Sequence, residues 1–273
     1  MPNSTYPTAD FTQIESVEMS WGTLAYRRTG TGKPLVLLHS LALNGLMWEP
    51  IVSEIAVDHQ AIIVDMRGHG ASCWDGSEFS VNDLASDLHT LLDELELDQI
   101  DLLGLSMGGS VALTFAALWP TRCERLALCD TTAWYGPTAP KSWAERAQSV
   151  LNTTDRSQLL DFQLDRWFTE AFRSEHPQSV AHIAEIFVAT DPRAHAQACL
   201  ALGAMDSREL LGAITAKTVI ITGEEDYATP PAMGEELGRA IAGSKFHIWP
   251  QARHLSPFES PSIRAELVGH LTI

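Results

Sequence analysis

The sequence predicts an α/β fold: a mostly parallel sheet with helices on both faces, interrupted by a helical insertion. Two observations support this prediction. Short continuous apolar runs alternate with longer amphipathic stretches, which is the pattern of parallel strands joined by helices. The strand-like runs stop near residue 134 and resume near residue 218. We therefore expect a first core segment at 1–133, a helical cap at 134–211 and a second core segment at 212–273.

The first core segment is divided by its apolar runs and turn residues. Residues 1–15 are a polar lead-in. Residues 18–28 alternate weakly between apolar and polar, and residues 29–33 contain two glycines and form a turn, so we expect an N-terminal hairpin. Apolar runs predict buried strands at residues 34–39, 61–65, 100–105 and 125–130. Helices are expected at residues 44–56 after Asn44, at 80–95 with Ser80 or Asn82 as the cap, and at 110–119.

The cap segment contains no strand-like run and is rich in aromatic residues. We expect helices at residues 141–151, 156–171, 178–189 and 192–204. Alternation then resumes with a strand at 218–223, a helix at 231–242, a strand at 245–249 and a final helix from Pro261. Because the sheet is completed after the interruption, we favour an insertion over a separate helical domain.

The acidic composition limits the classes of partner. A net charge of −17 over 273 residues argues against nucleic acid and anionic membrane surfaces, which require basic protein surfaces. No run is apolar enough to span a bilayer, and residues 1–12 do not resemble a signal peptide. The four cysteines lack the spacing of a metal site or a disulfide framework. We expect a cytoplasmic protein with no metal or organic cofactor, and leave a homo-oligomer open.

The central motif is Gly-Leu-Ser-Met-Gly at residues 104–108. It lies between a predicted strand and a predicted helix, and Ser106 occupies the sharp turn. Glycines on both sides leave room for the backbone to fold back, and the following helix begins with free N–H groups and a positive dipole. This context predicts that Ser106 is a nucleophile.

A serine nucleophile needs a base, and an acid that orients the base. Both are expected in loops at the carboxyl ends of strands. His254 follows the strand at 245–249, so we assign it as the base. Asp226 follows the strand at 218–223, so we assign it as the acid. Asp130, which ends another strand, and Glu225 are the alternatives for the acid.

The remaining histidines and one loop have other predicted roles. His247 and His270 are expected to be structural, and His59 and His89 to lie on the surface. Histidines in the cap segment are placed where they can contact a substrate: His176, His182 and His195. Arg67 and His69 lie in a glycine-rich loop and are expected to hold that loop by hydrogen bonds rather than to act in catalysis.

The oxyanion of a tetrahedral intermediate needs two backbone donors. One is the N–H of Met107, which follows the nucleophile. The other is expected from the loop after the strand at 34–39, and we assign it to Leu41, with Ser40 as the second choice. Removing one such donor typically lowers turnover by roughly a hundredfold to a thousandfold.

Taken together, these segments resemble the α/β-hydrolase superfamily. The resemblance is carried by Leu38–Leu41, Asp65–Gly70, the motif at 104–109, Gly223–Asp226 and His254. It implies a mostly parallel eight-stranded sheet with a helical cap. Within the superfamily the chain is most similar to 3-oxoadipate enol-lactonases. This closer similarity is carried by His39-Ser40-Leu41, residues 166–172, residues 189–192 and residues 226–231. His39 and Ala42 depart from the usual residues of that family.

The resemblance implies hydrolysis of a lactone or ester through an acyl-enzyme at Ser106. An enol-lactone of this kind carries a carboxylate, for which Arg146, Arg166 and Arg173 are candidate partners. Ser40, Trp134, Trp143, Arg146 and Trp167 are the expected substrate-binding residues, and His195 is a further candidate for the pocket lining. Two alternatives remain at this point: a carboxylesterase or lactonase of different substrate range, and a non-catalytic relative that binds a ligand.

Overall fold

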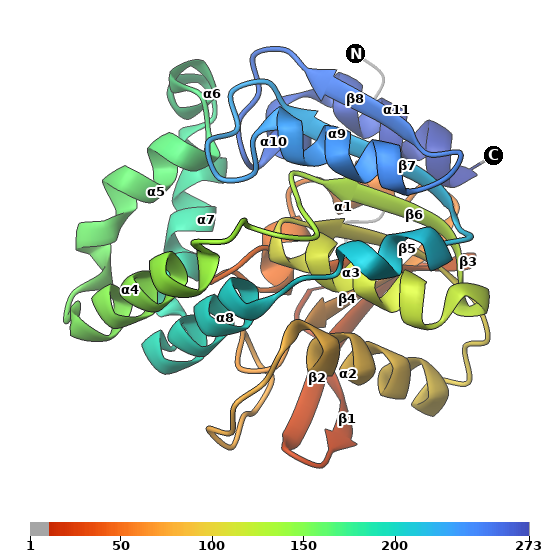
Figure 1. Cartoon of the computed structure of the whole chain (residues 1–273), viewed down its shortest axis with the longest axis horizontal. Coiled ribbons are helices and arrows are strands. Elements are labelled where there is room, and N and C mark those ends of the chain that lie inside the picture. The colour runs from red at the N-terminus through yellow and green to blue at the C-terminus, as the bar shows by residue number, and fades with distance from the viewer. Residues whose placement is uncertain (1–10, 273) are drawn as a thin grey trace.

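A single sheet organises the computed structural model, which describes residues 11–272 (Figure 1). Most of the polar lead-in predicted at 1–15 therefore lies outside the described residues.

The sheet has eight strands in the order β1-β2-β4-β3-β5-β6-β7-β8. Their bounds are β1 Glu15–Met19, β2 Gly22–Gly30, β3 Lys33–Leu38, β4 His59–Asp65, β5 Ile100–Leu105, β6 Cys123–Cys129, β7 Lys217–Gly223 and β8 Lys245–Trp249. β2 pairs antiparallel with both β1 and β4, and the other pairings are parallel. The predicted mostly parallel sheet is confirmed.

Helices cover both faces of the sheet. In Figure 1, α2, α3 and α9 lie in front of it, and α1 and α11 pack together behind it. The helices of the core are α1 Val52–Ile55, α2 Val81–Glu94, α3 Met107–Leu118, α9 Pro231–Ala240, α10 Ser256–Glu259 and α11 Pro261–Thr272. The short 3₁₀ helices of the core are η1 Gly45–Trp48, η2 Pro120–Arg122 and η4 Arg208–Ala213. Ser80 caps α2 by accepting a hydrogen bond from the Asp83 N–H, as one of the two predicted caps.

The cap lies between β6 and β7 in the sequence and at one side of the core in space (Figure 1). Its helices are α4 Ala139–Asn152, η3 Arg156–Leu159, α5 Leu160–Trp167, α6 Glu170–Glu175, α7 Pro177–Ala189 and α8 Pro192–Ala204. α4 packs along α8. There is no side chain at Gly203, and a Cβ there would lie 2.7 Å from the Cβ of Trp143, so this glycine permits the close approach of the two helices.

The N-terminal hairpin is present, but its predicted turn was wrong. β1 and β2 are joined at Ser20–Trp21, and β2 continues through the residues 29–30 that the sequence assigned to the turn. The glycine-rich residues instead lead from β2 to β3, which are not neighbours in the sheet. A Cβ at Gly32 would lie 2.1 Å from the Asp58 carbonyl oxygen, so this passage over the start of β4 requires glycine.

Two predicted helices are interrupted. The helix expected at 44–56 is split into η1 and α1. Pro50 lies between them, and a proline inside a helix has no N–H to donate and clashes with the preceding turn. The helix expected at 156–171 is split into η3, α5 and the start of α6. Phe168 is extended there, and the Thr169 hydroxyl accepts from the Phe172 N–H and starts a new helix.

His59 is not on the surface as expected. It is 4% exposed, and its Nε2 lies 3.1 Å from Oδ2 of the buried Asp101. Lys33 Nζ lies 2.7 Å from the other oxygen of that carboxylate. A buried carboxylate needs partners, and here the amino ends of β3 and β4 supply them to Asp101 on β5. The hydrogen bond to Asp101 raises the pKa of His59, and burial opposes this shift.

Candidate active site

Ser106 lies on the turn between β5 and α3, with backbone angles φ 55° and ψ −117°. Such a conformation is costly for a residue with a side chain, by about 1–3 kcal/mol. The surrounding structure tolerates it because neighbouring positions have no Cβ. A Cβ at Gly104 would lie 2.3 Å from the Gly108 carbonyl oxygen, and one at Gly108 would lie 2.3 Å from the Leu38 carbonyl oxygen. The glycines therefore let the start of α3 contact both β5 and the end of β3.

The structure brings three polar side chains together at the carboxyl ends of the strands. His254 Nε2 lies 2.8 Å from Ser106 Oγ, and His254 Nδ1 lies 2.9 Å from Asp226 Oδ2. Ser106, Asp226 and His254 are 4%, 3% and 5% exposed. The Asp226 carboxylate holds the proton on Nδ1, so Nε2 has a free lone pair directed at the serine hydroxyl. This arrangement can remove the hydroxyl proton during an attack on a carbonyl carbon.

The Asp226 carboxylate has a partner for each oxygen. Oδ1 accepts from the N–H groups of Ala228 and Thr229 at 2.7 and 3.0 Å, and Oδ2 accepts from the Thr229 hydroxyl at 2.7 Å. Burial raises the pKa of Asp226, but His254 and these hydrogen bonds outweigh burial and lower it overall. The carboxylate is therefore held ionised beside the imidazole.

Neither alternative acid contacts His254 in the described part of the chain. The Asp130 carboxylate accepts from the N–H groups of Gly223 and Ser256, at 2.9 and 3.1 Å. Burial, followed by the nearby Asp226 charge, raises its pKa well above the usual range. Glu225 is directed away and pairs with Arg253. Asp130 thus ties together the two loops that carry Asp226 and His254.

The expected oxyanion donors are Met107, which follows Ser106, and Leu41, which lines the same cavity. Met107 is the first residue of α3, where the N–H has no partner within the helix. Ser40 and Leu41 both line the cavity at Ser106. His39 anchors their loop, because its Nδ1 donates to the Ser40 carbonyl at 2.8 Å and its Nε2 accepts from the Met66 N–H at 2.9 Å. Burial, together with His69, lowers the pKa of His39, so the ring is neutral in this role.

The loop that follows β4 is held as the sequence predicted. Two guanidinium nitrogens of Arg67 donate to the Asp87 carboxylate at 2.9 and 2.6 Å. His69 Nδ1 lies 3.0 Å from the Arg67 carbonyl oxygen. Neither side chain lines the cavity at Ser106.

The cavity at Ser106 has a volume of about 60 Å³. The core contributes Ser40, Leu41, Ser106, Ala228 and His254, and the segment between β6 and β7 contributes Tyr135, Trp143, Arg146, Gln163, Arg166, Trp167 and Leu202. Ser40, Trp143, Arg146 and Trp167 therefore lie where the sequence predicted. Gln163 was missed, although it is three and four residues from Arg166 and Trp167 and so shares their helical face.

Trp134 was wrongly assigned to the cavity. Its ring stacks on the guanidinium of Arg208, with 3.6 Å from Cζ to the ring centroid, and its backbone forms a bridge with Asp206. Tyr135, the next residue, lines the cavity instead and packs edge-on against Trp143. The sequence offered no signal for this choice, because adjacent aromatic residues in an irregular segment point in different directions.

Four further candidates also lie away from the cavity. Arg173 pairs with Asp165, with 3.2 Å between Nη2 and Oδ1. His195 is fully buried and accepts from Arg156 through Nδ1 at 3.3 Å. His176 and His182 are likewise absent from the cavity lining.

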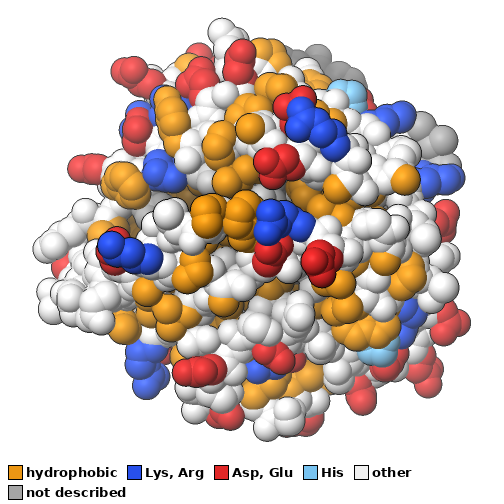
Figure 2. Space-filling view, viewed as in Figure 1, with side chains coloured by type: hydrophobic (Ala, Val, Ile, Leu, Met, Phe, Trp, Pro, Cys, Tyr) orange, Lys and Arg blue, Asp and Glu red, His pale blue; other side chains and the backbone are white. Residues whose placement is uncertain are grey.

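Arg146 and Arg166 place two positive charges at the cavity in an otherwise acidic protein. Neither forms an ion pair with a carboxylate within residues 11–272. Arg146 stacks on Trp143, with 5.0 Å from Cζ to the ring centroid. Burial, followed by repulsion from Arg146, lowers the pKa of Arg166. In contrast, acidic side chains are scattered over the face shown in Figure 2, as expected of charge that only solvates the surface.

Comparison with known proteins agrees with this fold. Residues 33–261 match the family model of the α/β-hydrolase fold. The chain belongs to the α/β-hydrolase family. Among curated α/β-hydrolases, 3-oxoadipate enol-lactonase 2 of Acinetobacter baylyi is 29% identical over 227 residues, which cover 83% of this chain and 84% of that protein.

Two solved structures are also similar to this α/β-hydrolase. The enol-lactonase from Burkholderia xenovorans LB400 is 32% identical, with a TM-score of 0.88 over 95% of this chain and 100% of that one. A malate-bound thermophilic esterase from Thermogutta terrifontis is 31% identical, with a TM-score of 0.85 over 95% and 100% of the two chains.

Among the described residues, no group of three or more histidine, cysteine, aspartate or glutamate side chains is arranged to hold a metal ion. No described helix is long and apolar enough to cross a membrane.

Proposed function

We propose that this protein is a serine hydrolase that opens a lactone or ester through a Ser106–His254–Asp226 triad. The observation that carries the proposal is the pair of contacts from one imidazole, 2.8 Å to Ser106 Oγ and 2.9 Å to Asp226 Oδ2. Membership of the α/β-hydrolase family supports the reaction class.

In the proposed mechanism, Ser106 Oγ attacks the carbonyl carbon while His254 Nε2 takes the hydroxyl proton. Asp226 stabilises the resulting imidazolium, and the N–H groups of Met107 and Leu41 hold the tetrahedral oxyanion. Collapse of the intermediate breaks the bond to the leaving oxygen, which receives the proton from His254. Water then attacks the acyl-enzyme with His254 again as base, which releases the acid and restores Ser106.

The preferred substrate in this proposal is 3-oxoadipate enol-lactone. The names of the Acinetobacter and Burkholderia relatives support an enol-lactone. Adipate is a dicarboxylate, and lactone formation consumes only one carboxylate, so the substrate keeps a negative charge. Arg146 and Arg166 supply positive charge beside Ser106 without a carboxylate partner of their own. Trp143 and Trp167 supply apolar walls for the ring.

Opening the ring of an enol-lactone does not require a strong acid to protonate the leaving group, so His254 is sufficient as the proton donor. The leaving group is an enolate, whose negative charge is delocalised, so protonation by His254 is undemanding. The cavity of about 60 Å³ is small beside ligand pockets of roughly 300–1,000 Å³. We therefore expect α4, which carries Trp143 and Arg146, to move outward when a substrate binds.

An esterase with a different substrate range is the second candidate, supported by similarity to the Thermogutta esterase. A panel of enol-lactones, saturated lactones and uncharged aryl esters separates the two. Preference for the carboxylate-bearing enol-lactone supports the first proposal, and equal or better turnover of uncharged esters supports the second. A burst of product from a chromogenic ester, equal to the enzyme concentration, identifies the acyl-enzyme. Absence of hydrolysis across the whole panel contradicts both candidates and favours a ligand-binding relative.

A further inference from the structure

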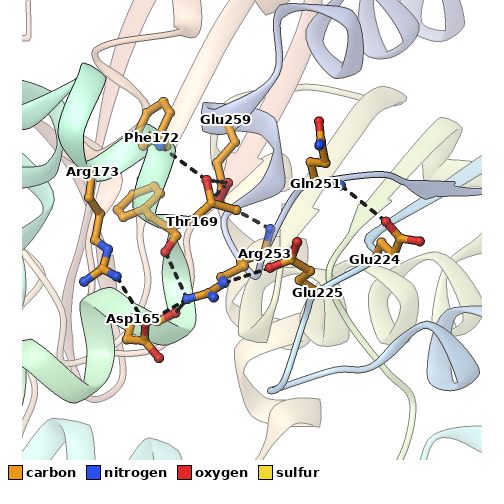
Figure 3. Close-up of polar contacts among 10 residues, drawn as sticks. Asp165, Thr169, Phe172, Arg173, Glu224, Glu225, Gln251, Arg253 and Glu259 are labelled. Atoms are coloured by element: carbon orange, nitrogen blue, oxygen red, sulfur yellow. Dashed lines mark hydrogen bonds and ion pairs between the residues drawn. The ribbon is translucent and has the colours of Figure 1, made fainter.

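A polar network joins the cap to the loop that carries His254 (Figure 3). At its centre is Arg253, whose Nη1 donates to Asp165 Oδ1 at 2.9 Å and to the Phe168 carbonyl at 3.4 Å, and also to the Asp165 carbonyl. Its Nε donates to Glu225 Oε2 at 3.4 Å. One guanidinium therefore contacts the end of α5 on one side and the residue before Asp226 on the other.

Glu259 makes a second connection in the same place. Its Oε1 accepts from the N–H groups of Thr169 and Arg253, at 3.0 and 3.3 Å, and its Oε2 accepts from the Thr169 hydroxyl at 3.0 Å. Burial raises the pKa of Glu259, and these hydrogen bonds oppose the shift. The carboxyl group thus ties the start of α6 to the backbone N–H of Arg253, the residue before His254.

Backbone hydrogen bonds run alongside these side chains. The His254 N–H donates to the Arg166 carbonyl at 3.4 Å, and the Leu255 N–H donates to the Trp167 carbonyl at 3.1 Å. The side chains of Arg166 and Trp167 form part of the cavity wall. Residues 165–169 therefore carry both a wall of the substrate cavity and the attachment of the base, so a shift of this segment moves the two together.

We propose that Arg253 and Glu259 are positioning residues that hold His254 on Ser106 and align the cap wall with it. The inference rests on the proposed role of His254 as the base. Asp165 is 57% exposed on its side chain, and ion pairs at a surface contribute about 0–1 kcal/mol to stability. Misplacement of a reacting group by about 1 Å can instead lower the rate by roughly a hundredfold. The effect of the network is therefore expected in turnover rather than in folding.

The test compares Arg253→Ala and Glu259→Ala with two reference variants. Glu259→Gln keeps a carbonyl oxygen that can accept from both N–H groups, and Arg239→Ala removes a surface ion pair with Glu235 on α9. kcat is measured per active site, with sites counted from the ester burst. We expect kcat to fall about 10- to 100-fold in both alanine variants with KM within about twofold, and to stay within about threefold in Glu259→Gln. Arg239→Ala is expected to match the wild type.

An unchanged kcat per titrated site in both alanine variants overturns the inference, whatever happens to their melting temperatures. If the wild-type protein hydrolyses nothing in the panel, it is the proposed function that fails. Amide hydrogen exchange at Leu255 then tests whether Arg253 holds the His254 loop against residues 165–169. Faster exchange in Arg253→Ala than in Arg239→Ala supports the attachment, and equal rates overturn it.

Discussion

The core and the cap contribute different kinds of residue to one cavity. The core side contributes Ser106 and His254, with Asp226 behind them, and these side chains bond to one another. The cap side contributes aromatic rings and two arginines that have no carboxylate partner in the described residues. Side chains that hydrogen-bond to one another are held in place before a substrate binds. Arginines without a carboxylate partner can instead bind an anionic group of a ligand. In the proposed function, the reaction chemistry therefore comes from the core and the substrate choice from the cap.

The largest expected effect is at the core. Ser106→Ala removes the nucleophile and is expected to lower kcat by roughly a millionfold, because residues of a triad act as a unit. Turnover of a chromogenic ester is the measurement, with circular dichroism to check folding. A Ser106→Ala protein that folds and keeps most of its activity would contradict the role of Ser106, and with it the assignment of the reaction chemistry to the core.

The next effect distinguishes the two buried acids. Asp226→Asn is expected to lower kcat by about ten-thousandfold, because the imidazole loses the partner that holds its tautomer. Asp130→Asn is expected to keep kcat within about tenfold, since burial favours the neutral carboxyl group, which an amide resembles in shape. The reverse ranking in a side-by-side assay would move the acid from the loop after β7 to the end of β6.

A smaller effect is expected from the cap. Arg146→Ala removes a charged hydrogen-bond donor worth about 1.5–3 kcal/mol, so kcat/KM for a carboxylate-bearing lactone should fall roughly 10- to 100-fold. Hydrolysis of an uncharged aryl ester should change little, and the ratio of the two substrates is the quantity to report. The matched control is Arg193→Ala, which removes a surface ion pair with Asp191. A loss shared equally by both substrates would place Arg146 in the reaction chemistry.

The smallest expected effect lies far from the cavity, at the amino ends of the strands. The pKa of His59 is raised in the folded protein, so its ion pair with Asp101 contributes stability fully below the unfolded pKa of about 6.5. That contribution is lost as pH rises through the higher folded pKa. The stability difference between wild type and His59→Gln, measured in urea, should therefore shrink as the pH is raised above the unfolded pKa of about 6.5, while kcat stays unchanged. A difference independent of pH would show that folding does not shift the pKa of His59.

Local patterns accounted for much of the fold. The apolar runs of β3–β7 and the periodicity of α2 are signals within a few residues, and they were found at nearly the predicted positions. Pro50 and Thr169 show the limit of such signals, because each breaks a helix within an otherwise helical pattern. The pairing of β2 with β4 rather than with β3 joins residues as far apart in sequence as Ala25 and Asp65, and hydrophobic periodicity gives no information on such contacts.

By itself, the sequence determined the alternation of strands and helices, the glycine-lined turn at Ser106, and the order of serine, aspartate and histidine after β5, β7 and β8. These are consequences of local sterics and of side-chain period. Only the tertiary structure decided that Tyr135 faces the cavity and Trp134 does not, and that Arg166 reaches it while Arg173 pairs with Asp165. The physical reason is that the direction of a side chain in an irregular segment or on a short helix is set by what packs against it. Here those neighbours, Asp206 and Arg208 for Trp134, come from distant parts of the chain.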